Sequence, residues 1–81
     1  MNINTIYIPV IETVNSNSFK VTKERSNSLL QAIKNGKQYA KLVVHDTVHL
    51  VTIAKYEQSE DGSQPVYIGQ VTLSAMKEAM A

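Results

Sequence analysis

Apolar and polar residues alternate or cluster along this chain in ways that predict mostly strand. Residues 5–14 are β-branched or aromatic almost throughout, which suits a pleated surface. Because Pro9 cannot donate a ladder hydrogen bond, we expect this strand at a sheet edge, or interrupted there by a bulge. The turn-forming residues 15–18 then lead to a second strand over 19–23, with Phe19 and Val21 on one face.

From about Ser26 the apolar positions change to helical spacing, with a stripe formed by Leu29, Leu30, Ala32 and Ile33. Ser26 or Asn27 is the expected N-cap, although Thr22 offers an earlier start. Asn35-Gly36 suits the left-handed residue that follows many helices. The pattern therefore predicts a helix of roughly ten residues, 26–35, that packs its stripe on the sheet.

The most strand-like stretch follows this helix. Residues 38–44 and 48–57 are separated by His45-Asp46-Thr47, which predicts a hairpin. One face of that hairpin carries aliphatic and polar side chains together: Lys41, Val43, His49, Val51, Ile53 and Lys55. Three aliphatic residues on such a face indicate burial under another element or a self-association interface.

The last third of the chain predicts a loop, a strand and a helix. Residues 58–65 are polar and contain Asp-Gly, typical of an exposed loop, and residues 66–73 form a strand in which Gly69 marks a bulge or a close backbone approach. Ser74 is the expected cap of a short helix over 75–81. The fold class is thus α+β, a small antiparallel sheet of about five strands with one packed helix and a short C-terminal helix, in the order ββαβββα.

Composition adds limits to this picture. The 81 residues suit a single domain, 1–81, and the lack of cysteine excludes disulfides, thiolate nucleophiles and cysteine-ligated metals. The core must be aliphatic, helped by Phe19 and two of the four tyrosines. Such a thin core makes a homodimer an expectation. No segment reads as a signal peptide or membrane span, so we expect a cytoplasmic protein without a membrane partner.

Catalytic chemistry has little support in the sequence. The glycines are isolated, so no phosphate-binding loop is indicated, and the acidic pair Glu60-Asp61 lies in a polar loop. His45, Asp46 and His49 have the residue types of a two-histidine, one-carboxylate metal site, but they flank a predicted turn instead of sharing a helix face. We therefore expect no catalytic residue, no metal site and no cofactor, and hence no enzyme.

Charge is distributed unevenly along the chain. The formal net charge is +1, yet residues 18–41 hold six basic side chains against Glu24, a net of +5, whereas residues 42–81 net −3. The basic residues are Lys20, Lys23, Arg25, Lys34, Lys37 and Lys41. They are the candidate electrostatic contacts to a partner. With Tyr39 available for stacking, segment 18–41 supports one alternative, a module that binds single-stranded DNA or RNA.

The function that fits best is that of a small non-enzymatic binding protein acting through macromolecular interaction. By analogy of size, it is an accessory regulator or inhibitor from a phage or mobile element, such as an inhibitor of a host defence nuclease complex. The candidate stacking or interface residues are Tyr39, Val43, Val51 and Ile53. Residues 67–74 are loosely similar to the end of small coactivator-type single-stranded DNA binders, but the helix at 26–35 departs from that family's four-strand order.

Overall fold

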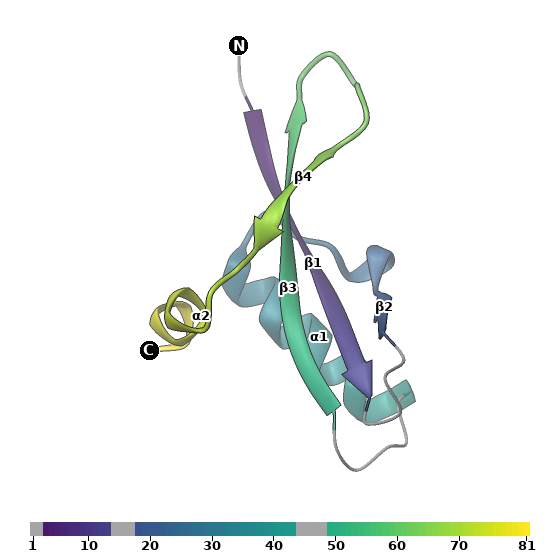
Figure 1. Cartoon of the computed structure of the whole chain (residues 1–81), viewed down its shortest axis with the longest axis vertical. Helices are drawn as coiled ribbons and strands as arrows, with labels where there is room; N and C mark the ends of the chain where they lie inside the picture. The colour runs from purple at the N-terminus through teal and green to yellow at the C-terminus, as the bar shows by residue number, and fades with distance from the viewer. Residues whose placement is uncertain (1–2, 14–17, 44–48) are drawn as a thin grey trace.

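The computed structural model describes residues 3–13, 18–43 and 49–81, which form a four-stranded antiparallel sheet and two α-helices (Figure 1). The elements are β1 (Ile3–Thr13), β2 (Ser18–Lys20), the 3-10 turn η1 (Thr22–Glu24), α1 (Leu29–Val43), β3 (His49–Ser59), β4 (Val66–Gln70) and α2 (Leu73–Met80). The strand order is β2-β1-β3-β4. The α+β class and the antiparallel sheet are confirmed, with one strand fewer than expected.

The pairing of β1 with β3 forms the centre of the sheet. Their register runs without interruption from Ile3 opposite Ser59 to Thr13 opposite His49. The outer strands are short and attach at opposite ends: β2 pairs with the last part of β1, and β4 pairs with residues 54–57 of β3. The sheet is consequently long and narrow, in a molecule of 44 × 27 × 19 Å (Figure 1).

The prediction that Pro9 marks an edge strand or a bulge is wrong. β1 lies between β2 and β3, and its register with β3 continues through Pro9. The backbone of Tyr7 exchanges two hydrogen bonds with Ser26, and the carbonyl of Pro9 accepts one from the N–H of Val21 at 2.9 Å. Alternate residues of a strand direct their polar groups to the same side. The missing N–H of Pro9 therefore falls on the β2 side, just beyond the end of β2.

The first helix is longer than predicted. The hydroxyl of Ser28 accepts a hydrogen bond from the N–H of Gln31, so Ser28 caps α1. The helix then continues past Asn35-Gly36 to Val43. Residues 38–43 are thus helical, the predicted hairpin of 38–44 with 48–57 is wrong, and β1 takes the place of its first strand. Packing favours helix over strand for residues 38–43, because Ile33, Gly36 and Ala40 are buried at helical spacing against the sheet.

Gly36 is required for close packing and does not end the helix. A Cβ atom at this position would lie 2.9 Å from the Cβ of Pro9 and 3.0 Å from a methyl carbon of Val51. Real side chains do not approach this closely without displacing a neighbour. The contact between Gly36 and Pro9 therefore sets how near α1 lies to the sheet.

The two core clusters lie between the helices and one face of the sheet, and Ile6, Ile8 and Ala54 are buried on the opposite face. One cluster contains Ala32, Ile33, Ile53 and Met76, and a second contains Ile11, Val21 and Ala40. Two of the three aliphatic residues predicted on one face, Val51 and Ile53, pack under α1, which confirms burial under another element for these two. The expectation that Phe19 belongs to the core is wrong: it is 37% exposed and packs edge-on against Tyr39 at 6.3 Å between ring centroids.

The C-terminal third follows the prediction with small changes. The register of β3 with β4 shifts between Lys55 and Tyr56, which face Gly69 and Tyr67, so Ile68 is the extra residue of a β-bulge. A Cβ at Gly69 would meet nothing within 4 Å, which selects the bulge over a close approach. Helix α2 is capped by Thr72, not Ser74: the Thr72 hydroxyl accepts a hydrogen bond from the N–H of Ala75 at 3.1 Å.

We expect Gly36→Ala to lower the free energy of unfolding by about 1–2 kcal/mol. Overpacking costs about 1–3 kcal/mol, and the better helix propensity of alanine returns up to about 1 kcal/mol. Urea unfolding followed by circular dichroism measures the change. The matched control is Gly69→Ala, where the new methyl group enters open space and the change should stay within about 0.5 kcal/mol. Equal losses in both variants would contradict the packing role of Gly36.

Candidate binding groove

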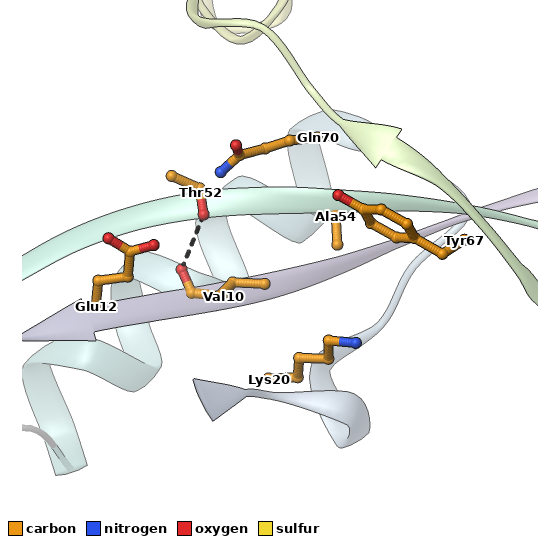
Figure 2. A pocket seen from close by; sticks show the side chains of 7 residues that line it. All are labelled: Val10, Glu12, Lys20, Thr52, Ala54, Tyr67 and Gln70. Atoms are coloured by element: carbon orange, nitrogen blue, oxygen red, sulfur yellow. Dashed lines mark hydrogen bonds between the residues drawn. The ribbon is translucent and has the colours of Figure 1, made fainter. Parts of the chain in front are cut away.

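The helices pack on one face of the sheet, and no described helix packs on the other. Residues of β1 and β3 alternate between these faces, so the neighbours of the buried Ile11 and Ile53 point away from α1. A cavity of about 260 Å³ lies on the open face, as Figure 2 shows. It is lined by Val10, Glu12, Lys20, Thr52, Ala54, Tyr67 and Gln70. All four strands therefore contribute to one hollow.

A second cavity of about 490 Å³ continues from the first toward α2. It is lined by Glu12, Thr52, Gln70, Val71, Thr72, Leu73 and Met76. Because Glu12, Thr52 and Gln70 line both cavities, the two form a single groove that runs from β2 to the first turn of α2. We call this the open-face groove.

Small side chains form the floor of the open-face groove. Val10 and Ala54 come from the two central strands, and the hydroxyl of Thr52 lies 3.5 Å from the carbonyl oxygen of Val10, to which it donates (Figure 2). Thr52 and Ala54 are buried, so the floor is fixed by the sheet. The size of these side chains, together with the curl of the sheet, leaves the space above them open.

An aromatic and cationic cluster forms the wall at the β2 end. The ammonium group of Lys20 donates a hydrogen bond to the hydroxyl of Tyr56 at 2.6 Å and lies 5.3 Å from the centroid of that ring. Tyr56 packs edge-on against Tyr67 at 5.4 Å between centroids. The hydrogen bond to Tyr56 is the main reason that the pKa of Lys20 is raised. Tyr67 itself stays 57% exposed and available to a ligand.

The electrostatic character of the groove is mixed. Glu12 belongs to both cavities, which places a carboxylate at the middle of the groove, while Lys20 lies near one end. The side chains of Thr52 and Gln70 add a hydroxyl and an amide. The carboxylate and the amide oxygen can accept hydrogen bonds from N–H groups, whereas a carboxylate at the middle of the groove is unfavourable for a phosphate backbone.

The six basic residues predicted as partner contacts are divided among several surfaces. Only Lys20 lines the open-face groove. Lys23 is exposed on η1, and Arg25 lines a separate hollow of about 240 Å³ beside Asn27. The remaining three are exposed on α1, which packs on the opposite face of the sheet: Lys34, Lys37 and Lys41. Segment 18–41 is therefore basic in sequence without presenting all six charges on one surface.

The predicted interface residues lie in the layer between sheet and helix. Ile53 is fully buried, and Val51 and Tyr39 are half-buried against the second core cluster. The side chain of Val43 is outside the described residues. Tyr39, Val51 and Ile53 therefore stabilise the core, and the groove uses other residues.

The predicted metal-type residues are mostly outside the described part of the chain. His45 and Asp46 lie within 44–48, and the side chain of His49 is likewise not described. Among residues 3–13, 18–43 and 49–81, no three histidine, cysteine, aspartate or glutamate side chains group as metal ligands would. In the same ranges no helix is long and apolar enough to cross a membrane.

Apart from Lys20, the residues of the groove are not predicted from the sequence, for one reason. Glu12 and Thr52 share a face only because β1 pairs with β3, whereas the sequence pattern assigns residues 48–57 to a hairpin with 38–44. Comparison with known proteins adds no relative: no family model, no curated protein and no solved structure matches the chain.

We expect Tyr56→Phe to lower the pKa of Lys20 toward its ordinary value of 10.5, because the substitution removes the hydroxyl that accepts its hydrogen bond. Because the hydrogen bond favours the charged ammonium of Lys20 in the folded chain, it adds to the free energy of unfolding at pH values below the ordinary pKa. This contribution is lost as the pH rises through the raised pKa of Lys20. NMR titration of the Lys20 side chain measures the shift. Tyr39→Phe, remote from Lys20, is the control and should leave the titration unchanged.

Proposed function

We propose that this chain is a small non-enzymatic domain that binds another protein and acts as an accessory regulator or inhibitor. The observation that carries this proposal is the open-face groove, which combines an apolar floor, an exposed tyrosine and a central carboxylate. An extended peptide segment fits this chemistry, because its N–H groups meet Glu12 and Gln70 while its side chains contact Tyr67 and Leu73. Tyrosine is also among the residues that most often anchor protein interfaces.

The lining of the groove supports binding more than catalysis. Among the described residues that line the groove, Glu12 is the one carboxylate, and none of them is a histidine. General acid–base or nucleophilic catalysis needs such a second group within hydrogen-bond reach. The groove instead offers a long contact surface that ends at an exposed Leu73.

The charge distribution supports a protein over a nucleic acid as the partner. A single strand bound to a sheet needs basic side chains along the path of its phosphates and aromatic rings beneath its bases. Tyr56, Tyr67 and Lys20 supply part of this pattern at one end of the groove. Glu12 interrupts it at the middle, and Lys34, Lys37 and Lys41 belong to the other face of the molecule.

Affinity capture with matched baits tests this proposal. The wild-type chain is expected to retain a protein from an extract of its own organism, with or without nuclease treatment. Tyr67→Ala should reduce that protein at least about tenfold, because it removes an anchor of the kind that dominates interfaces. The control Lys34→Glu reverses an exposed charge on α1 and should capture as well as the wild type.

Two outcomes would contradict the proposal. One is a partner that Tyr67→Ala retains and Lys34→Glu loses, which would move the binding surface to α1. The other is capture that nuclease abolishes, which would favour the single-strand alternative. Circular dichroism of each bait verifies that the variants are folded.

A further inference from the structure

Strand β4 presents an apolar outer edge. It is the last strand in the order β2-β1-β3-β4, and among the described residues no strand pairs with its outer side. Three consecutive side chains on it are largely exposed: Val66 at 62%, Tyr67 at 57% and Ile68 at 49%. Exposed apolar edge strands are templates for pairing with another strand.

The exposed side chains of β4 lie on both faces of the sheet. Val66 and Tyr67 are consecutive in a strand and so point to opposite faces, with Tyr67 toward the open-face groove. A partner placed on the groove covers Tyr67 and leaves Val66 in water. A strand added along the edge of β4 covers both residues, and it also pairs the outer backbone groups of β4.

The chain around β4 is electrically neutral. Residues 62–76 contain no aspartate, glutamate, lysine or arginine, although such residues make up 19% of the chain. Natural edges are usually protected by charges, by an internal proline or by a bulge, and within β4 the bulge at Ile68 is the one such device present. A neutral strand offers nothing to a charged partner, and it can face an identical strand without bringing like charges together.

We propose that β4 pairs with β4 of a second copy of this chain. The pairing is antiparallel, because Glu60 and Asp61 lie in the turn before β4 and a parallel pair would place two acidic turns side by side. In the antiparallel pair the turns lie at opposite ends of a five-residue strand. That separation is about 17 Å at ~3.4 Å per residue, which exceeds the screening length of about 8–10 Å.

This dimer has a consequence for the groove. Antiparallel edge pairing joins two four-stranded sheets through a two-fold axis that is roughly perpendicular to the sheet, so equivalent faces lie on the same side. The helices of both copies then cover one side, and the two open-face grooves line the other. Tyr67 of each copy lies close to the axis, where the two grooves approach each other.

Cysteine cross-linking tests the pairing directly, since the natural chain has no cysteine. Ile68 is the middle residue of β4, so Ile68→Cys places two thiols near the axis. Opposed Cα atoms in an antiparallel pair are about 4.5–5.5 Å apart, within the range that a disulfide spans. Mild oxidation is expected to convert most of Ile68→Cys to a covalent dimer that a reductant reverses.

The matched control is Asp61→Cys, an exposed thiol in the turn before β4. Antiparallel pairing holds the two thiols of this variant apart, so it should remain monomeric on a non-reducing gel. Equal cross-linking of both variants would indicate random collision, and stronger cross-linking of Asp61→Cys would indicate parallel pairing. Either result overturns the proposal.

Light scattering of the isolated chain supplies a second measurement. At about 100 µM the wild type should have twice the mass of one chain, because a dimer of micromolar Kd is largely formed there. Ile68→Lys brings two ammonium groups together at the axis and should halve that mass while circular dichroism shows a folded chain. A monomeric wild type overturns the proposal. These measurements contain no partner protein, so they fail or succeed independently of the capture experiment.

Discussion

The full-length pairing of β1 with β3 is the interaction on which the rest of this structure depends. The two strands match residue for residue from Ile3 to Thr13, so residues opposite each other point to the same face of the sheet. On one face Ile11, Val51 and Ile53 pack against the helices, and on the other Val10, Thr52 and Ala54 form the floor of the open-face groove. The short strands β2 and β4 then attach at opposite ends, which leaves one edge of β4 unpaired and gives the groove its two walls.

A single contact between α1 and the sheet determines how this framework closes. Gly36 has no side chain and Pro9 has no N–H group, and both absences matter for the packing of α1 and β1. At Gly36 the helix lies so close to Pro9 that a methyl group on the glycine would not fit between them. The side of Pro9 that lacks an N–H group faces the region just beyond the end of β2, where no strand hydrogen bond is lost. The close approach buries Ile33 and Ala40, and with them a core that contains few aromatic residues.

The surfaces left after this packing suggest what the molecule does. The open-face groove carries Glu12 at its middle and a fixed Lys20–Tyr56 pair at one end, which suits a polar, mostly neutral segment such as a peptide better than a phosphate chain. The edge of β4 is neutral and apolar on both faces, which suits an identical strand. The two surfaces share Tyr67, whose backbone belongs to the edge of β4 and whose side chain lines the groove.

The α+β class and the exposed loop before β4 followed from the sequence alone, and a bulge near Gly69 was one of the two alternatives predicted there. Each depends on local properties: β-branched runs, turn-forming residues and the absence of a side chain. The extent of α1, the central place of β1 and the groove did not follow. Residues 38–43 include the good helix formers Gln38, Ala40, Lys41 and Leu42. They continue α1 past Asn35-Gly36, which resembles a helix end in the sequence, because Gly36 and Ala40 are buried against the sheet. Glu12 lies near Thr52 only through a pairing between distant segments. Local preference differs by less than about 1 kcal/mol per residue between helix and strand, so the tertiary contacts decide these features.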